Sequence, residues 1–185
     1  MFNEAKTTQA AARLLKDAGA PMNFMVLMKM LYLADRAAFM KYGRSITNDI
    51  YYAMFLGPVL SNTHDLATEE LPPEEDHYWK RHISPRENHE VRLIADPGDR
   101  ELSEREVKIL DAIFAKFKGY LSDPFGLPKW MHKNLPEVKE VPRGQRDDLP
   151  ISEVLQGTKK SEEEIADLIS EIEMLDRVDA LFTAR

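Results

Sequence analysis

The residues best suited to chemistry are histidines and carboxylates, and the pair His64-Asp65 comes first along the chain. A metal-dependent phosphohydrolase with this dipeptide needs another histidine upstream and an aspartate downstream, which together hold the metal and its water. All other histidines of this chain follow His64, so the upstream ligand is missing. We therefore expect His64 and Asp65 to lie on a helix surface. A metal hydrolase of unknown type stays as a remote alternative, to be tested by metal analysis.

Three further histidines, His77, His82 and His89, lie close together in the sequence. The segments around them alternate as strands do, and this alternation places His77 and His82 on opposite faces of one strand. A metal site needs three or four ligands that converge on one point. We therefore expect these histidines to decorate an exposed hairpin and to bind no metal.

Other chemical signatures are missing from the sequence. The chain has no cysteine and only eight glycines, and it contains neither a G-x-S-x-G elbow nor a G-x-x-x-x-G-K-[ST] loop. Thiol catalysis, disulfides and nucleotide chemistry of the P-loop type are therefore excluded. We expect a protein that is not an enzyme, with no catalytic residue, no metal and no cofactor.

The elements that would position a site are mostly helical. The residues from Asn23 to Tyr42 are apolar on almost every side, which is typical of a central, buried helix. Capping boxes begin at Ser103 and at Ser161, each with a glutamate three residues later, and apolar residues follow both at helical spacing. The predicted helices span 3–18, 23–42, 59–68, 103–121, an irregular part of 123–138, 150–156 and 161–182.

Strand signals are fewer. The segment 46–55, ITNDIYYAMF, is rich in β-branched and aromatic residues. Gly57 permits unusual backbone angles and Pro58 suits the first turn of a helix, so we predict a strand-to-helix switch at this pair. The segments 77–83 and 89–95 predict a β-hairpin, and 142–150 predicts a loop. We expect a mostly helical α+β fold: one domain over residues 1–185, with about seven helices around the central helix and a small antiparallel β-sheet.

Methionines are concentrated near the central helix. Six of the nine lie within a short stretch: Met22, Met25, Met28, Met30, Met40 and Met54. Flexible thioethers fill irregular cores, and they also form adaptable binding surfaces. Both interpretations stay open, core filling being favoured because the helix is apolar all round.

The charge is acidic, with a net value of −7. The last segment, residues 161–185, carries eight Asp/Glu against two Lys/Arg. An acidic chain is a poor candidate for binding nucleic acid, because phosphate contacts need a basic face. The alternative function, a phage-associated DNA-binding or transcriptional regulator, would depend on the basic stretch from Lys129 to Arg146.

The sequence also predicts a cytoplasmic protein. The first residues, MFNEAKTTQAAARLL, lack the basic start, apolar core and cleavage site of a signal peptide. The longest apolar stretch, from Met22 to Tyr42, contains four charged residues, which argues against a membrane span.

One stretch, from Leu27 to Leu66, strongly resembles the signature of the SocA-like, or Panacea, antitoxin domain. In that family a helix of the form K-x-L-Y-x-A-D leads through Y-G-x-x-I-T to an aromatic strand, which closes with G-P-V and a further helix. The matching residues here are Lys29, Leu31, Tyr32, Ala34, Asp35, Tyr42, Gly43, Ile46, Thr47, Gly57, Pro58 and Val59. Weaker similarity continues in Leu102–Ser122 and Met131–Val138, so the resemblance covers about residues 10–156 and leaves the C-terminal helix unmatched.

The resemblance implies an antitoxin that neutralises a cognate protein toxin by direct binding. Such toxins are usually encoded next to the antitoxin, often in a prophage. At least one relative is thought to act as a proteolytic adaptor that presents its toxin to the ClpXP protease, so blocking and delivery both stay open.

Two contact surfaces are hypotheses at this point. We expect the toxin to contact Tyr32, Asp35, Tyr52, Phe55 and the turn Gly57, Pro58 and Val59, because these residues cluster in the part of the chain that matches the family signature. Gly57-Pro58 would then either only turn the chain or also present an aromatic edge, and aromatic side chains are favoured interface anchors. The C-terminal helix would either pack on its own domain or support a homodimer.

Overall fold

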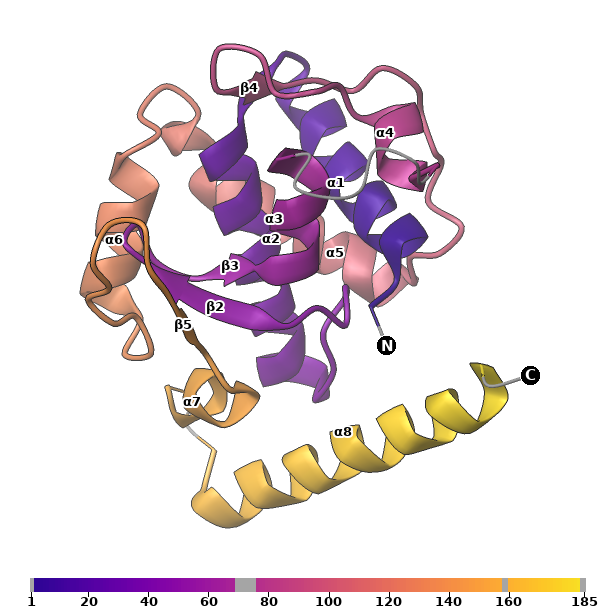
Figure 1. The fold of residues 1–185 in the computed structure, drawn as a ribbon, viewed down its shortest axis with the longest axis vertical. Coiled ribbons are helices and arrows are strands. Elements are labelled where there is room, and N and C mark those ends of the chain that lie inside the picture. The colour runs from indigo at the N-terminus through magenta and orange to yellow at the C-terminus, as the bar shows by residue number, and fades with distance from the viewer. Residues whose placement is uncertain (1, 69–75, 158–159, 184–185) are drawn as a thin grey trace.

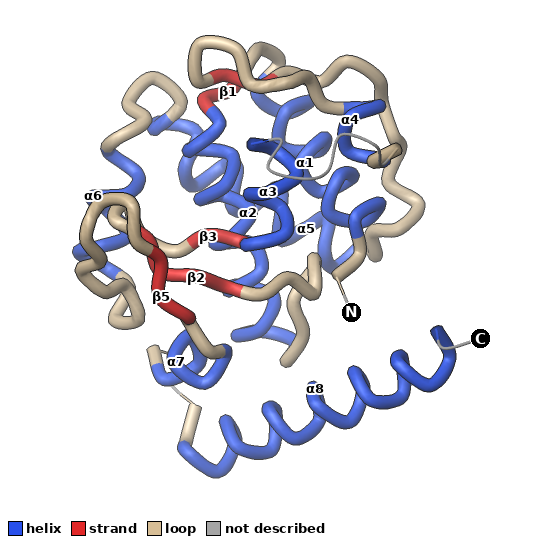
Figure 2. The backbone as a smooth tube through the Cα atoms, in the orientation of Figure 1, coloured by secondary structure: helices blue, strands red, loops and turns tan. Residues whose placement is uncertain are grey.

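The computed structural model describes residues 2–68, 76–157 and 160–183. Helices dominate it, as expected for a mostly helical α+β fold, and they surround α2 (Figures 1 and 2). The helices are α1 (Glu4–Ala18), α2 (Phe24–Tyr42), α3 (Ser61–Thr68), α4 (Tyr78–His82), α5 (Glu104–Phe117), α6 (Gly126–Asn134), α7 (Ile151–Gln156) and α8 (Glu162–Thr183), with a 3-10 turn at Lys118–Tyr120. The strands are β1 (Met22–Asn23), β2 (Tyr51–Met54), β3 (Val59–Leu60), β4 (Glu90–Val91) and β5 (Arg146–Asp148).

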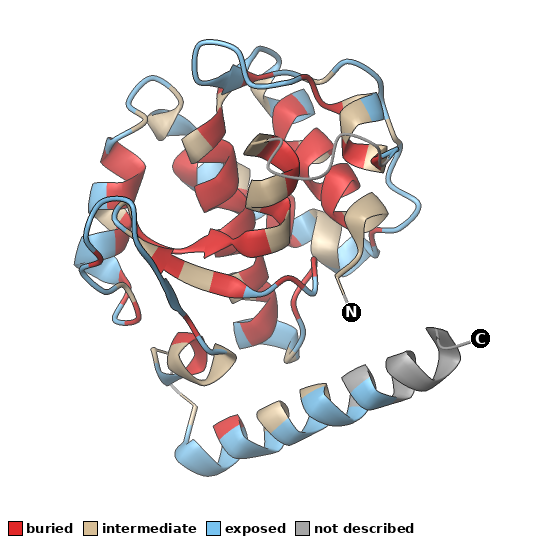
Figure 3. Cartoon of the chain, viewed as in Figure 1, coloured by how far each residue is buried: buried red, intermediate tan, exposed pale blue. Residues whose placement is uncertain are grey.

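The central helix is α2, as the sequence predicts. Asn23 caps it, since its side-chain oxygen accepts a hydrogen bond from Met25 N–H at 3.0 Å. Every residue from Val26 to Asp35 is buried (Figure 3), and α1, α5, α6 and α7 all pack against this helix. Gly43 ends α2 in the left-handed conformation, with a φ of 71°, which glycine adopts without strain.

Two small antiparallel sheets lie beside the helices. In the larger one, β2 is central and pairs with β3 on one edge and β5 on the other. In the smaller one, β1 pairs with β4, so that Met22 lies opposite Val91. The larger sheet covers α2 on the side of β3 (Figure 2).

The predicted strand-to-helix switch at Gly57-Pro58 is wrong in its details. Met54 C=O accepts a hydrogen bond from Gly57 N–H at 2.8 Å, which closes a β-turn with Phe55 and Leu56 at its centre. The chain then returns as β3, and α3 begins only at Ser61. The turn at Gly57 is therefore the tip of a hairpin, and its φ of 88° explains why a glycine stands there.

The predicted strand 46–55 is shorter than expected, because its first half has other partners. The carboxylate of Asp49 accepts hydrogen bonds from Asn62 N–H and Thr63 N–H, both at 2.9 Å. It therefore caps the start of α3 from a distant loop. Thr47 N–H likewise donates a hydrogen bond to Asp35. The residues before Tyr51 are therefore held by side-chain hydrogen bonds and not by pairing with a neighbouring strand.

The predicted hairpin of 77–83 and 89–95 forms only in part. Residues 78–82 are α4, which packs on α1 and α3. Glu4 accepts a hydrogen bond from Trp79 N–H at 2.9 Å and so satisfies a free donor of the first turn, while the Trp79 side chain is buried. What remains of the hairpin is an antiparallel bridge between Ile83 and Leu93, with a second bridge between Glu87 and Glu90 near the turn.

The predicted loop 142–150 contains a strand. Residues 146–148 pair with β2, with Asp148 opposite Tyr52 and Arg146 opposite Met54. All three are exposed, so no alternation of apolar residues marks this strand in the sequence.

The long helix α8 lies along one side of the body, and its N-terminal part packs near α7 (Figure 1). Its capping box is formed: Glu164 accepts a hydrogen bond from Ser161 N–H at 2.7 Å, and Ser161 accepts one from Glu164 N–H at 3.2 Å. Ile165 is buried, and Leu168, Ile169 and Ile172 are half-buried against the core. The first half of the apolar face therefore packs on its own domain.

Candidate partner-binding site

One side of α2 carries a polar stripe: Lys29, Tyr32, Asp35 and Arg36. Tyr32, Asp35 and Arg36 follow Lys29 by three, six and seven residues, and this spacing places all four along one helix face. Lys29, Tyr32 and Asp35 are buried, and a buried polar group must find a partner or lose stability. Each residue of the polar stripe reaches a segment that is distant in sequence.

Lys29 holds the tip of the β2–β3 hairpin. Its Nζ donates hydrogen bonds to Gly57 C=O and Pro58 C=O, both at 2.8 Å. Burial lowers the pKa of Lys29 to about 7, because desolvation disfavours the charged form. The neutral amine has two N–H donors, which match the two carbonyls of the hairpin.

Asp35 organises the loop before β2. Its carboxylate accepts hydrogen bonds from Ile46 N–H at 2.9 Å, Thr47 N–H at 3.1 Å and Tyr51 O–H at 3.1 Å, and also from the Thr47 hydroxyl. Burial raises the pKa of Asp35 to about 6, and the hydrogen bonds oppose this rise without cancelling it.

Tyr32 and Arg36 hold the segment after α6 through Glu137. Tyr32 O–H donates to Glu137 Oε1 at 3.0 Å, and Arg36 Nε lies 2.5 Å from the same oxygen. The Glu137 side chain has no exposed area. Burial and the neighbouring Glu137 carboxylate raise the pKa of Tyr32 well above its usual value, so the phenol stays a hydrogen-bond donor.

The structure therefore divides the residues expected to contact a toxin. Tyr32, Asp35, Gly57, Pro58 and Val59 are all buried. The remaining two are accessible: Tyr52 is half-buried and Phe55, at the tip of the hairpin, is 43% exposed. The buried residues can support a binding surface, while direct contact falls to Phe55 and Tyr52.

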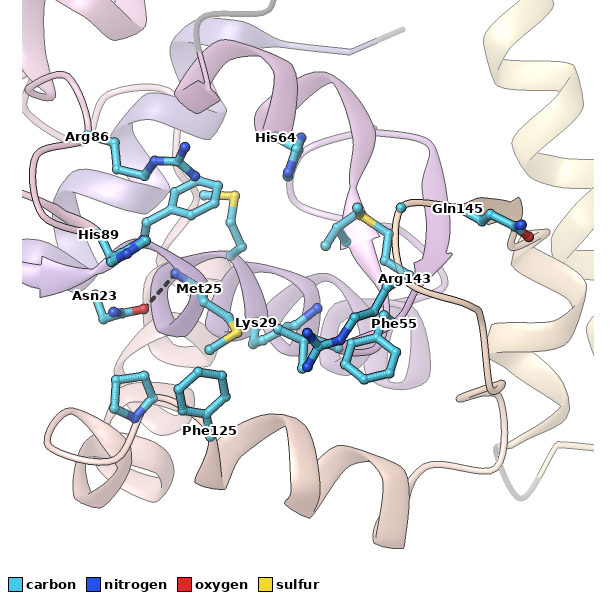
Figure 4. A pocket seen from close by; sticks show the side chains of 17 residues that line it. Asn23, Met25, Lys29, Phe55, His64, Arg86, His89, Phe125, Arg143 and Gln145 are labelled. Carbon is cyan, nitrogen blue, oxygen red and sulfur yellow. Dashed lines mark hydrogen bonds between the residues drawn. The ribbon is translucent and has the colours of Figure 1, made fainter.

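Beside Phe55 lies a groove of about 600 Å³ that the sequence did not reveal (Figure 4). Its floor is the start of α2, its walls are the hairpin tip and the loop before α6, and its rim includes the loops around residues 86–89 and 143–145. The apolar members of its lining are Phe24, Met25, Met28, Met54, Phe55, Leu56, Val59, Pro124 and Phe125. The volume lies in the range of sites that bind ligands.

The rim of this groove is basic. Arg86 stacks over the Phe24 ring at 5.2 Å, and Arg143 stacks over the Phe55 ring at 4.7 Å. Both arginines are exposed, and cation–π contact holds each guanidinium at the edge of the groove. The arrangement can bind an apolar group next to negative charge.

Comparison with known proteins now adds the family. A family model described as "Antitoxin SocA-like, Panacea domain" matches residues 27–136, which is more than half of the chain. This chain belongs to the SocA-like Panacea antitoxin family. No curated protein and no solved structure matches it.

The Panacea match includes the whole polar stripe and the hairpin. In this member, the signature residues Lys29, Tyr32 and Asp35 tie distant segments to α2, and Gly57-Pro58 supplies the two carbonyls that Lys29 binds. The match ends at residue 136, inside the expected range of 10–156, and α7 and α8 follow it.

The histidines of this Panacea protein do not converge. His64 is half-buried, lies 5.8 Å from the Phe24 ring and lines the groove. His82 stacks on Tyr78 at 4.5 Å, and His77 lies 3.4 Å from Glu4. Among the described residues, no three His, Asp or Glu side chains are grouped so as to hold a metal ion.

The basic stretch 129–146, the basis of the DNA-binding alternative, is divided between two elements. Lys129 and Lys133 lie exposed on α6, whereas Arg143 and Arg146 stack on Phe55 and Tyr52 of the hairpin. The stretch therefore forms no continuous basic helix.

Sequence reasoning missed Arg86, Phe125, Arg143 and Glu137. The first three come from loops, where position in space depends on the fold. For Glu137 a signal existed: the polar stripe lies in an apolar helix, so Arg36 and Tyr32 would need a buried acidic partner.

No helix in the described part of the chain has the length and apolarity to cross a membrane.

Proposed function

We propose that this protein neutralises a cognate protein toxin in the cytoplasm by stoichiometric binding, without catalysis, and that the tip of the β2–β3 hairpin is part of the contact. Membership of the SocA-like Panacea family carries this proposal. The exposed Phe55 and the half-buried Tyr52 supply the aromatic anchors that such an interface favours.

The hairpin supports the proposal because its position is fixed before any partner arrives. Lys29 holds both carbonyls at its tip, and Val59 and Tyr51 pack into the core. A rigid anchor loses little conformational entropy on binding, and this preserves affinity.

The test is a growth assay with the product of the neighbouring gene. We expect that protein alone to stop growth and co-expression of this chain to restore it. A harmless neighbour, or a toxic one that this chain does not neutralise, would contradict the proposal for that pair.

The hairpin contact is tested by a pull-down of the toxin with Tyr52→Ala and Phe55→Ala variants. We expect at least one to weaken capture by about tenfold or more, as hot-spot aromatics do. A matched control is Ile94→Ala, which removes an exposed apolar side chain (52% exposed) outside the groove. Folded variants that capture toxin at full strength would place the interface elsewhere.

Direct blocking and delivery to a protease are distinguished by repeating the growth assay in a strain that lacks ClpX. Rescue in both strains supports direct blocking. Rescue that disappears without ClpX supports delivery of the toxin to the ClpXP protease. Retention on a DNA column that falls steeply with salt would instead favour the DNA-binding alternative.

A further inference from the structure

We propose that the groove beside Phe55 binds a segment of the toxin that presents large apolar side chains flanked by Asp or Glu. This inference rests on the proposed function and specifies the chemistry of the partner. The groove is the space of about 600 Å³ bounded by α2, the hairpin tip and the loops that carry Arg86, Phe125 and Arg143 (Figure 4).

The apolar part of the partner follows from the floor and walls. Met25, Met28 and Met54 line the groove together with Phe55 and Phe125. Phe125 is 59% exposed and Phe55 is 43% exposed, so two aromatic rings are left partly uncovered on opposite walls. Methionine side chains adapt to the shape of an apolar insert, and covering two partly exposed aromatic rings favours binding.

The acidic part follows from the charges. Of the 17 residues that line the groove, none carries a carboxylate, whereas Arg86 and Arg143 are exposed basic residues at its rim. The whole chain is acidic, with a net charge of −7. A basic rim on an acidic protein attracts an acidic segment and repels a basic one.

The rim is also prepared for binding. Arg86 and Arg143 each stack on an aromatic ring that belongs to the groove, at 5.2 and 4.7 Å from the ring centres. A guanidinium that is already held in place loses less freedom when it meets a carboxylate. Apolar insertion and charge pairing can therefore occur together.

The chain's own acidic helix is a weaker candidate for the occupant. In α8, Ile165 is buried and Leu168, Ile169 and Ile172 are half-buried against the body. Docking α8 of a second copy into the groove would first uncover these side chains. A foreign segment has no such cost, and for this reason we assign the groove to the toxin.

The first experiment uses a synthetic probe, so it does not depend on knowing the toxin. An amphipathic peptide of about four helical turns, with leucine on one face and glutamate on the other, is titrated into the intact chain by calorimetry, alongside a twin with lysine in place of glutamate. We expect the acidic peptide to bind at least about tenfold more tightly, with weaker binding at higher salt. Equal binding of the two peptides, or none, would overturn the charge assignment.

Variants then locate the binding. Arg143→Glu and Phe125→Ala should each weaken the acidic peptide by about tenfold or more. The matched controls are Arg100→Glu, which reverses an exposed charge outside the groove, and Ile94→Ala. Loss in the controls as large as in the groove variants would overturn the location.

The absence of cysteine provides an independent readout. A fluorophore on Gln145→Cys, at the rim of the groove, should change its emission when the acidic peptide binds, whereas one on Ile94→Cys should not. A change at Ile94→Cys alone would place the peptide elsewhere.

The growth assay separates this inference from the proposed function. If the wild-type chain rescues growth and Arg143→Glu and Phe125→Ala fail, both proposals are supported. If all three rescue growth equally, the antitoxin function holds and the groove assignment is wrong. A homodimer in solution that Arg143→Glu dissociates would show that a second copy occupies the groove, and would also overturn the assignment.

Discussion

Two regions along one face of α2 have different roles. The polar stripe of Lys29, Tyr32, Asp35 and Arg36 is closed, because its groups are bonded to distant segments and largely hidden from solvent. The start of the helix, with Met25 and Met28, opens into the groove, and Lys29 lies where the two regions meet. The comparison shows that the residues that define the family signature in this chain hold the fold together, while the residues available to a partner come mainly from the hairpin tip and loops.

The largest effect is expected from Asp35→Ala. This substitution leaves Ile46 N–H, Thr47 N–H and two hydroxyls without their acceptor in the core, and each unsatisfied buried group costs about 1–3 kcal/mol. We expect a loss of about 4 kcal/mol or more in the free energy of unfolding, measured by urea denaturation. The control Asp99→Ala, at an exposed position, should change it by less than about 0.5 kcal/mol. A mild effect at Asp35 would show that the polar stripe does not hold the fold.

The next effect is expected from Glu137→Leu. It leaves Arg36 and the Tyr32 hydroxyl beside an apolar side chain, and breaking a buried pair by removing one partner costs about 3–5 kcal/mol. The double variant Arg36→Met, Glu137→Leu should recover part of this loss, because the uncompensated charge is gone. Denaturation of both variants measures the difference. A double variant no more stable than Glu137→Leu would argue against a charge penalty.

A smaller effect is expected from pH at Lys29. Its pKa is about 7 in the folded chain and 10.5 for an ordinary lysine, so between these values the unfolded chain binds more protons. The contribution of Lys29 to stability is therefore lost as pH falls from 10.5 to 7 and grows as pH rises, by about 1 kcal/mol per pH unit.

The measurement compares the wild-type chain with Lys29→Met in urea at about pH 7.5, 8.5 and 9.5, values inside that window. The difference between them should move in favour of the wild type with rising pH. A difference independent of pH would show that Lys29 keeps its charge in the folded state.

The smallest effect on stability is expected at the groove. Phe125 is 59% exposed, so Phe125→Ala should change the free energy of unfolding by less than about 0.5 kcal/mol while it weakens toxin capture. The change in toxin capture relative to the change in stability distinguishes the two regions most clearly. For Asp35→Ala the change in stability should be the large one. A Phe125→Ala variant that unfolds easily would contradict the distinction between the two regions.

Much of the fold could be predicted from the sequence, because its signals are local. The caps at Asn23, Ser103 and Ser161 and the apolar spacing behind them predicted α2, α5 and α8. The exposed strand β5 could not be predicted, since it is held by backbone pairing with β2. The helix α4 was mistaken for a strand, because its first turn depends on Glu4 and a buried Trp79.

The candidate site was predicted only in part. Phe55 and Tyr52 are accessible as expected, but Tyr32 and Asp35 are interior. A polar residue in a helix that is apolar all round must be buried and paired. The sequence therefore already indicated that Tyr32 and Asp35 face inward. The groove could not be predicted, because it joins loops that only the tertiary structure brings together.

Because the groove is built from segments far apart in the sequence, it has consequences for the synthesis and the proteolysis of the chain. The groove takes its floor from residues 23–29, one wall from 54–59, another from 124–125 and its rim from 86–89 and 143–145. No short fragment of the chain contains it. Under the groove assignment proposed above, a nascent chain cannot capture the toxin there before residue 145 has been synthesised, and a protease cut that separates these parts should release the bound segment.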